Sequence, residues 1–466
     1  MFVLKVVLLL LSPFIVLYWL LKTYVRRVDA KYRQQNGLRD DVKIIAFFHP
    51  FCNSGGGGER VLWVALRALH HKYPDYHYVV YTGDIEAKPE EIKAKAKKQF
   101  QIDLNFDISF VYLKKRYIVG DRLYPIFTLL GQSIGSVFLG FEALFQCVPD
   151  VYIDSMGFSF TFPVFRYIGG SRVGAYVHYP TISTDMLQMV TNTKTSYNNR
   201  AIISNSRVLT SGKLLYYKLF AYLYGLIGRM ALVVMVNSSW TQRHVESIWK
   251  RKARTVYPPC NTDDLKRLSL QNKKELQIVS IGQIRPEKNH SLQVIAFKEF
   301  IDKLSSEGID TQSAKLVIIG SCRDDEDRQR LNDLKQLSRS LDIESNVEFK
   351  VNIPYEELKD LIEESSIGVH TMVNEHFGIG VVECLAAGLI TLTHASGGPK
   401  LDLITDGVNG FLATDSQSFC QKLYNIYNLN KSKLNDIRLN ARKSADRFSE
   451  QEFETLFLTS IEEILH

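Results

Sequence analysis

The chain has 466 residues, of which 45% are hydrophobic and 23% charged, so it is long enough for two or three domains with apolar cores. Its formal net charge of +7 suits work near anionic lipids or phosphate-bearing substrates, but it is not the charge signature of a nucleic-acid-binding protein. The six cysteines form no C-x-x-C pair and no His/Cys cluster, which indicates reduced thiols in the cytosol and no structural metal.

Residues 1–22 predict an N-terminal membrane anchor. Residues 2–21 are apolar except at Lys5, Ser12 and Pro13, and about 20 such residues span a bilayer as a helix. Basic residues follow directly, at Lys22, Arg26, Arg27, Lys31 and Arg33. By the positive-inside rule they keep the body of the protein on the cytosolic side. A cleaved signal peptide is the competing interpretation, but no small-x-small cleavage site follows this long run.

Residues 40–256 predict a first α/β domain. Apolar runs bounded by charged or turn residues indicate buried parallel strands at 43–48, 76–81, 106–113, 148–154, 172–178 and, as the last of them, 233–237. Helical segments lie between most of these runs, which is typical of a doubly wound, Rossmann-like sheet. Two apolar segments, 123–148 and 214–236, are either helices that dip into the membrane or helices buried in the domain. The sequence leaves both alternatives open.

Residues 275–437 predict a second Rossmann-like domain. Its strands are expected at 276–281, 316–320, 347–351, 367–370 and 389–393. The proline pair and polar residues of 257–274 indicate a linker between the domains. The charged helical segment 438–466 is expected to pack back on the first domain. The carboxyl ends of the two sets of strands would then face each other across a cleft.

Two carboxylates flank a glycine turn in the second domain. Glu375 and Glu383 stand eight positions apart, with Gly378 and Gly380 between them and an apolar helix following. The glycines allow backbone to approach a ligand closely, and the free amides at the start of the helix, around Ile379, suit a diphosphate. This pattern resembles the E-x7-E element of retaining glycosyltransferases with the GT-B fold. A surface loop entering an ordinary amphipathic helix is the competing interpretation.

A cationic loop, GQIRPEK, follows the first strand of the second domain. It resembles the G-R-x-x-x-x-K loop of the same glycosyltransferases. Lys288 falls at the position of the family lysine, whereas Gln283 occupies the arginine position and Arg285 stands two residues later. Cations here would stabilise the negative charge that a departing nucleoside diphosphate gains. The competing interpretation is a strand-to-helix loop with solvent-facing charges.

Two glycines follow the strand expected at 389–393. Gly397 and Gly398 precede a helix that is expected to begin near Pro399. They resemble the glycine-rich donor-side loop of these enzymes and would let phosphate approach the backbone and the helix start. A plain turn between strand and helix is the competing interpretation.

The first domain contributes a glycine run and a histidine. Gly55, Gly56, Gly57 and Gly58 follow the first strand and suit a loop that holds a diphosphate of the donor or of the acceptor lipid. The run is not a P-loop, because no Gly-Lys-Ser/Thr follows it. His178 ends the fifth strand and matches the histidine that retaining GT-B enzymes direct toward the donor sugar. A histidine at a strand end is more often structural.

Four segments extend the resemblance over nearly the whole chain after the anchor: FFHPFCNSGGGGERVLW, YVHYPTISTDM, SIGQIRPEKNH and NEHFGIGVVECLAAG. They are similar to the eukaryotic GDP-mannose-dependent α-1,2-mannosyltransferases that extend the dolichyl-pyrophosphate-linked oligosaccharide. The resemblance implies addition of the fourth and fifth mannoses of the N-glycan precursor on the cytosolic face of the endoplasmic reticulum membrane. Its implied partners are GDP-mannose, the lipid-linked oligosaccharide, membrane lipids and other mannosyltransferases of the pathway, without nucleic acid.

The resemblance also implies roles for the nucleotide-binding residues. Lys288 and Arg285 would hold the diphosphate together with the backbone amides of residues 378–380. Glu383 would hold the ribose. No cofactor is implied, and no metal ion is expected, because cations and helix dipoles would carry the diphosphate charge.

On the sugar side, Glu375 would orient the mannose and His178 would assist from the first domain. Retention of configuration is expected, with front-side attack assisted by the leaving phosphate. Two alternatives stay open. One is an enzyme of the same fold with another nucleotide-sugar or lipid acceptor, and the other is a membrane-tethered scaffold of this fold that has lost catalysis.

Overall fold

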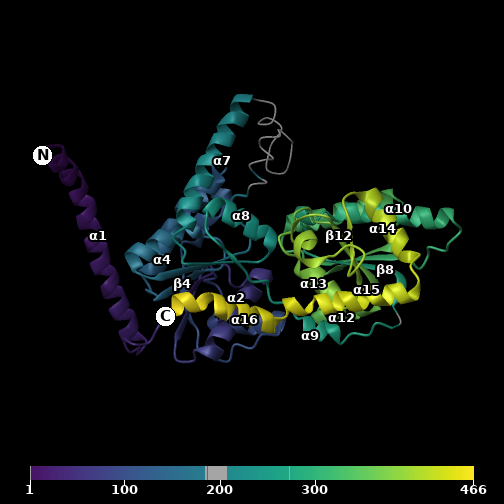
Figure 1. Ribbon diagram of the computed structural model, residues 1–466, viewed down its shortest axis with the longest axis horizontal. Helices are drawn as coiled ribbons and strands as arrows, with labels where there is room; N and C mark the ends of the chain where they lie inside the picture. The colour runs from purple at the N-terminus through teal and green to yellow at the C-terminus, as the bar shows by residue number, and fades with distance from the viewer. Residues whose placement is uncertain (1, 184–185, 187–206, 272) are drawn as a thin grey trace. The chain divides into compact units, whose positions relative to one another are not determined.

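The computed structural model describes residues 2–183, 186, 207–271 and 273–466, and the side chains of residues 2–11, 14 and 207–211 lie outside that description. The chain forms two units, each built on a parallel sheet (Figure 1). Unit 1 comprises Met1–Asn237, Thr241–Val256 and Glu454–His466. Unit 2 comprises Ser238–Trp240 and Tyr257–Phe453.

The seven strands of unit 1 lie in the order β3-β2-β1-β4-β5-β6-β7. In chain order they are β1 (Ile44–Phe48), β2 (His77–Thr82), β3 (Ser109–Tyr112), β4 (Val151–Asp154), β5 (Arg172–Val177), β6 (Val233–Val236) and β7 (Arg254–Thr255). The prediction that 233–237 is the last strand is wrong, because β7 pairs with β6 in parallel. A two-residue strand is too short to give an apolar run that a sequence pattern can detect.

Helices connect the strands of unit 1: α1 (Phe2–Gln35), α2 (Gly57–Lys72), α3 (Pro89–Phe100), α4 (Thr128–Leu144), α7 (Arg207–Gly228) and α8 (Ser239–Trp249). The C-terminal helix α16 (Glu450–Leu465) returns to this unit. Phe457 stacks on Phe47 with ring centroids 6.5 Å apart, and Arg67 forms an ion pair with Glu454 at 2.7 Å. Because successive strand residues face opposite sides of the sheet, Phe47 meets α16 while its neighbour Phe48 lies in the core on the other face.

The six strands of unit 2 lie in the order β10-β9-β8-β11-β12-β13. They are β8 (Lys274–Ile281), β9 (Lys315–Gly320), β10 (Val347–Val351), β11 (Ser365–His370), β12 (Ile390–His394) and β13 (Phe411–Ala413). The helices are α9 (Thr262–Lys266), α10 (His290–Ser306), α11 (Asp325–Ser340), α12 (Tyr355–Glu364), α13 (Ile379–Ala386), α14 (Ser416–Tyr427) and α15 (Lys431–Ser444). Apolar residues on both faces of the strands build two cores, with Ile278 in one and Val279 in the other.

The unit boundaries differ from the expected domain boundaries at two places. Residues 257–274, expected as a linker, fall within unit 2, where the short helix α9 packs Leu265 into a core. The return to unit 1 begins at Glu454 rather than at 438, since α15 stays with unit 2 and buries Ile437 and Ala441 there. Polar composition alone does not separate a linker from a helix that buries one or two side chains.

The apolar segments of unit 1 bury one face and expose another. In α4, Leu139 is buried while Phe138 is 61% exposed, and in α7, Phe220 is buried while Leu215 is 69% exposed. Among the residues whose side chains are described, no helix is long and apolar enough to cross a membrane. The expected anchor falls largely on residues 2–11, whose side chains lie outside the described part.

Candidate active site

Three loops of unit 2 meet because their strands are neighbours. The loops after β8, β11 and β12 carry Lys288, Glu375 and the glycine pair Gly397–Gly398, and the order β8-β11-β12 sets these strands side by side. All pairs are parallel, so the three loops leave the same edge of the sheet. In open parallel sheets this carboxyl edge is where ligands bind. The structure therefore brings together the predicted donor-side residues that sequence placed more than 80 positions apart.

Glu375 is a buried carboxylate with several donors around it. Its Oε2 forms an ion pair with Lys288 Nζ and accepts a hydrogen bond from His370 Nε2 at 3.1 Å. Its Oε1 accepts from the backbone N–H of His376 at 3.1 Å. Burial by itself would raise the pKa of this carboxyl, but the charge of Lys288 and the bond from His370 hold the pKa well below its ordinary value. Glu375 is consequently ionised at neutral pH.

Lys288 is held by a side chain from the neighbouring loop and by packing within its own loop. The Thr371 hydroxyl lies 2.9 Å from the Lys288 carbonyl and accepts a hydrogen bond from Gln293 at 3.0 Å. The aliphatic part of the lysine packs over Gly282, where an added Cβ would stand 3.7 Å from Lys288 Cδ. The backbone and the aliphatic part of Lys288 are therefore held in place, so its ammonium group has a defined position beside Glu375. Stabilising charge on a ligand requires such a preorganised cation.

His370 is a site residue that the sequence analysis missed. It ends β11, is buried, and donates to Oε2 of Glu375, whereas the backbone N–H of His376 donates to Oε1. Because an ionised carboxylate only accepts, Nε2 of His370 carries the proton in this contact. A polar residue ending an otherwise apolar strand, five positions before a candidate carboxylate, is the signal that could have found it.

His290 lies behind this cluster and titrates abnormally. Burial, together with the charges of His370 and Lys288, lowers the pKa of His290 to about 3. An unfolded chain protonates an ordinary histidine below about pH 6.5. Between the two values the unfolded state binds one more proton, so acid destabilises the fold and the stability present at neutral pH is lost as pH falls.

Substituting His290→Gln is expected to remove this pH dependence. The difference in free energy of unfolding between the parent protein and the variant should shrink by about 1.4 kcal/mol per pH unit as the pH falls from 6 to 4. Urea unfolding of both proteins at matched pH values measures this difference, in which all other titrating groups cancel. A difference that does not vary with pH would show that His290 does not stay neutral in the fold.

The glycines of the E-x7-E segment serve backbone geometry. Gly378 precedes α13 with φ +101°, a conformation that disfavours any residue with a Cβ. A Cβ on Gly380 would stand 2.9 Å from the carbonyl oxygen of Ile281, so the start of α13 approaches the end of β8 closely. Ile379 is the first residue of the helix, and Glu383 lies in its second turn, half-buried.

Gly397 and Gly398 pack against the loop that carries Glu375. Added Cβ atoms would stand 2.2 Å from the Glu375 carbonyl oxygen and 2.5 Å from that of His376. Gly398 N–H donates to the Glu375 carbonyl at 2.7 Å, and the Ser396 hydroxyl accepts from Asn374 N–H at 2.7 Å. These glycines thus have a structural reason, the close approach of two loops, alongside the predicted contact with phosphate.

Arg285 lies in the same loop as Lys288 but makes different contacts. Its side chain is half-exposed and forms no hydrogen bond or ion pair with the residues that the structure describes. Gln283, at the arginine position of the family pattern, is also half-buried. Arg285 is therefore a cation at this edge of the sheet that no carboxylate of the described chain engages.

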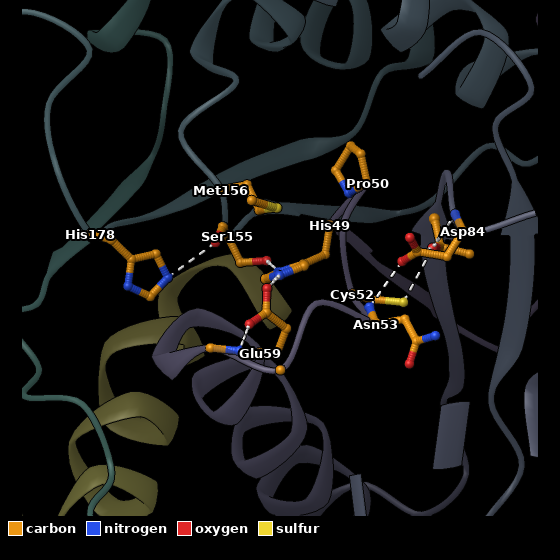
Figure 2. Close-up of polar contacts among 12 residues, drawn as sticks. His49, Pro50, Cys52, Asn53, Glu59, Asp84, Ser155, Met156 and His178 are labelled. Atoms are coloured by element: carbon orange, nitrogen blue, oxygen red, sulfur yellow. Dashed lines mark hydrogen bonds and ion pairs between the residues drawn. The ribbon is translucent and has the colours of Figure 1, made fainter. Parts of the chain in front are cut away.

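Three adjacent strands also define an edge in unit 1. β1, β4 and β5 are neighbours, and the residues that follow or end them are His49, Ser155 and His178. His178 Nε2 lies 3.1 Å from the Ser155 carbonyl oxygen, and a Cβ on Gly58 would stand 3.5 Å from the same nitrogen (Figure 2). The histidine and the glycine run, predicted separately, therefore lie side by side at this edge.

The glycine loop, residues 53–58, is tied down at its carbonyl groups. Gln99 donates to the Gly55 carbonyl at 2.6 Å and Lys95 donates to the Asn53 carbonyl at 2.5 Å. The N–H groups of Gly57 and Gly58, at the start of α2, donate to no residue that the structure describes. Such amides, with the helix dipole behind them, suit an anionic group.

Only Gly55 of this run requires glycine for its conformation. Its φ is +81°, so Gly55→Ala is expected to cost about 1–2 kcal/mol of folding free energy. Gly58 lies in the first turn of α2, where alanine favours the helix, so Gly58→Ala should be neutral or stabilise by up to about 1 kcal/mol. Urea unfolding should show a loss of stability for Gly55→Ala and none for Gly58→Ala, and equal losses in both variants would contradict this assignment.

The described part of the chain contains no group of three or more His, Cys, Asp or Glu side chains that could hold a metal ion. The buried Cys52 and Cys384 are not candidate nucleophiles. Burial raises the pKa of the Cys52 and Cys384 thiols far above the ordinary value.

Two family models match the chain. Residues 42–249 match the model described as ALG11 mannosyltransferase N-terminus, and residues 261–444 match that of Glycosyl transferases group 1. Curated proteins named GDP-Man:Man(3)GlcNAc(2)-PP-Dol alpha-1,2-mannosyltransferase are similar over most of their length. The protein from Homo sapiens is 53% identical, with 90% of this chain and 87% of that protein covered. That from Caenorhabditis elegans is 44% identical, with 92% and 93% covered.

Solved structures share the architecture at low sequence identity. Anabaena Alr3699/HepE in complex with UDP and glucose has a TM-score of 0.61 at 16% identity, covering 90% of this chain and 99% of that one. A glycosyltransferase from Rickettsia africae has a TM-score of 0.59 at 15% identity, covering 91% and 99%. These likenesses confirm the predicted GT-B-like α/β fold with two parallel sheets.

Proposed function

The chain belongs to the family of GDP-Man:Man(3)GlcNAc(2)-PP-Dol alpha-1,2-mannosyltransferases, and from that membership we propose how its two units divide the reaction. The protein is an α-1,2-mannosyltransferase that uses GDP-mannose and a dolichyl-pyrophosphate-linked oligosaccharide. Unit 2 binds GDP-mannose at the edge that carries Lys288 and Glu375. Unit 1 presents His178 and the glycine loop to the reacting sugar and the acceptor.

The cluster of Glu375, Lys288 and His370 carries this proposal. These three ionisable side chains converge at the carboxyl edge of a parallel sheet. Lys288 neutralises the charge of Glu375, and His370 donates a hydrogen bond to it. When the diphosphate of GDP-mannose binds, its negative charge competes with Glu375 for Lys288. The lysine then stabilises the leaving group, and Glu375, still held by His370, is available to a mannose hydroxyl.

The nucleotide is held by the start of α13. Backbone amides of residues 378–380 contact the diphosphate, Arg285 adds a second cation, and Glu383 accepts hydrogen bonds from the ribose. Gly397 and Gly398 border the same loop and let the phosphate come close to backbone.

Sugar transfer proceeds with retention at the anomeric carbon. The bond between that carbon and the β-phosphate oxygen breaks, and a bond to the acceptor hydroxyl oxygen forms on the same face. The acceptor proton passes to the leaving phosphate, so GDP carries away both charge and proton. Charge stabilisation by Lys288, Arg285 and helix amides requires no metal ion in this scheme.

The protein works at the cytosolic face of the endoplasmic reticulum membrane, where it adds the fourth and fifth mannoses and meets other mannosyltransferases of the pathway. Residues 1–22 anchor it by their apolar run. The exposed apolar side chains of α4 and α7, such as Phe138 and Leu215, support contact with lipid in the same unit. Deleting residues 2–21 should lower the fraction of the protein that floats with membranes, and an unchanged fraction would contradict the anchor.

Transfer to a defined acceptor tests the proposed function. Membranes carrying the protein are incubated with a Man(3)GlcNAc(2) lipid acceptor and labelled GDP-mannose, UDP-glucose or UDP-N-acetylglucosamine, with and without EDTA. One or two α-1,2-linked mannoses should be added from GDP-mannose alone, at a rate that EDTA leaves unchanged. Transfer from a UDP-sugar alone would overturn the donor, and loss of transfer with EDTA would overturn metal independence.

A further inference from the structure

A buried hydrogen-bonded network joins three strand ends and one helix in unit 1. His49 Nδ1 lies 2.8 Å from the Ser155 hydroxyl, and His49 Nε2 lies 3.4 Å from Glu59 Oε1 (Figure 2). His49, Ser155 and Glu59 are each at most 5% exposed. They come from the ends of β1 and β4 and from the first turn of α2, up to 106 positions apart.

The donors and acceptors of this network run in one direction. Burial would raise the pKa of Glu59, but hydrogen bonds from His49 and Gly56 lower it below its ordinary value, so this carboxylate is ionised and only accepts. His49 Nε2 therefore donates to Glu59 Oε1, and Gly56 N–H donates to Oε2. In the neutral ring, His49 Nδ1 then accepts the Ser155 hydroxyl proton.

The two ends of the network touch the two predicted site elements of this unit. At one end, Glu59 binds the N–H of Gly56 and so fixes the glycine loop where α2 begins. At the other end, the Ser155 carbonyl accepts a hydrogen bond from His178 Nε2, so His178 presents Nδ1 as its acceptor nitrogen when neutral. Figure 2 shows His178, Ser155, His49 and Glu59 in succession, with Asn53 of the glycine loop held by Asp84 beyond them.

A second set of bonds fixes the turn in which Ser155 stands. The buried Asp154 carboxylate accepts from the N–H groups of Met156 and Gly157, each at 3.1 Å. The backbone carbonyl that orients His178 is thus held from its own turn by Asp154 and from β1 by the side chain of His49. A histidine supported only by its own strand would keep the freedom to rotate about its side-chain bonds.

The geometry points to Glu59, His49 and Ser155 as positioning residues for mannose transfer. None of the three touches a substrate, since each is buried, and they act on mannose transfer by holding His178 in one fixed orientation. This inference rests on the proposed role of His178 beside the reacting sugar. It goes beyond that role by assigning the orientation of His178 to a carboxylate on a different element.

A double-mutant cycle between Glu59 and His178 tests the network. Glu59→Gln keeps the size of the side chain but has only one acceptor oxygen. His49 and Gly56 each donate to a separate oxygen of Glu59, so one of these two donors loses its acceptor in the variant. The variant should lower kcat by about tenfold, the effect of leaving one buried donor unsatisfied. The KM for GDP-mannose should stay within about twofold, because the proposed donor site lies in unit 2.

Coupling decides between positioning and general support of the fold. If Glu59 acts through His178, then Glu59→Gln should lower kcat by less than about twofold in a His178→Ala background. Fully multiplied losses would overturn the inference, as would an unchanged kcat in Glu59→Gln. A His178→Ala variant with full activity would instead refute the role of His178 itself, which separates the two failures.

Two further variants keep the test independent of folding defects. Ser155→Ala removes the hydroxyl but keeps the carbonyl that binds His178, so it should lower kcat by about threefold and couple to His178→Ala in the same way. His77→Gln is the matched control. His77 opens β2 at the opposite edge of the sheet and contacts the Tyr32 hydroxyl at 3.1 Å, so its replacement should leave kcat unchanged. Additive losses for Ser155→Ala and His178→Ala would also overturn the inference.

Discussion

Replacing Lys288 by methionine is expected to lower the kcat of mannose transfer by about 100- to 1,000-fold. Lys288 Nζ is the charged group that reaches Glu375 at the carboxyl edge of unit 2, where we place the diphosphate. Methionine matches the unbranched apolar part of the lysine side chain and removes the ammonium group with its charge. The diphosphate then has no ammonium partner, and the loss is largest in the transition state, where further negative charge develops on the leaving GDP.

The same substitution should cost stability, because it leaves Glu375 buried without its cation. Breaking a buried ion pair in this way costs about 3 kcal/mol. Initial rates at saturating GDP-mannose, measured on protein shown to be folded by circular dichroism, separate the loss of rate from the loss of folded protein.

Lys298→Met is the matched control for Lys288→Met. Lys298 also pairs with a carboxylate, Asp302 at 2.7 Å, but this pair lies on the outer surface of α10. Surface pairs of this kind contribute little, so the control should keep full kcat and lose less than about 0.5 kcal/mol of stability. Full activity in Lys288→Met, or equal losses in both variants, would contradict the role of Lys288.

Replacing Glu375 by glutamine is expected to lower kcat by about 100-fold or more. Oε2 of Glu375 serves Lys288 and His370 together, and Oε1 serves the N–H of His376. A glutamine amide provides one acceptor oxygen and turns two donor hydrogens toward a cation or another donor. The residue proposed to orient the mannose therefore loses both its charge and its fixed position.

Glu383→Gln provides the contrast for Glu375→Gln. Glu383 lies in α13, where we assign it to the ribose, so its loss should raise the KM for GDP-mannose more than it lowers kcat. Steady-state rates over a range of GDP-mannose concentrations distinguish the two outcomes. Equal changes in kcat for both glutamates would show that the two carboxylates do not have separate roles.

The acid side of the pH–rate profile should not depend on Glu375. Its pKa is depressed in the fold, so its contribution to stability is present above the pKa of an ordinary glutamate, about 4.3, and is lost only as the pH falls through the depressed value. Transfer rates that decline between pH 5 and 7 must then reflect other groups, and this decline should persist in Glu375→Gln.

Local pattern determined much of this protein from its sequence. Apolar runs located eleven of the strands, because a buried parallel strand must be apolar on both faces. The shorter β7 and β13 carry too few residues to produce such a run. Lys288 and Glu375 were identifiable as candidates because each stands in a loop that follows a buried strand and falls within a motif that resembles those of retaining glycosyltransferases.

Only the tertiary structure decided which of these residues meet. The order of strands in a sheet depends on contacts between distant segments, and neither composition nor periodicity records it. The neighbourhood of β8, β11 and β12 joins Lys288 to Glu375, and His370 becomes visible as a third partner only there.

The glycines separate the two kinds of information most clearly. The sequence predicted that Gly397 and Gly398 contact phosphate. Their lack of a Cβ atom also allows close approach by the backbone of residues 375–376, in the loop that follows β11. In unit 1 the four glycines drew attention to a loop, whereas the side chains that hold its start are Glu59 and His49. Burial of polar groups requires partners, and only the folded chain brings Ser155 to His49 across 106 positions to supply one.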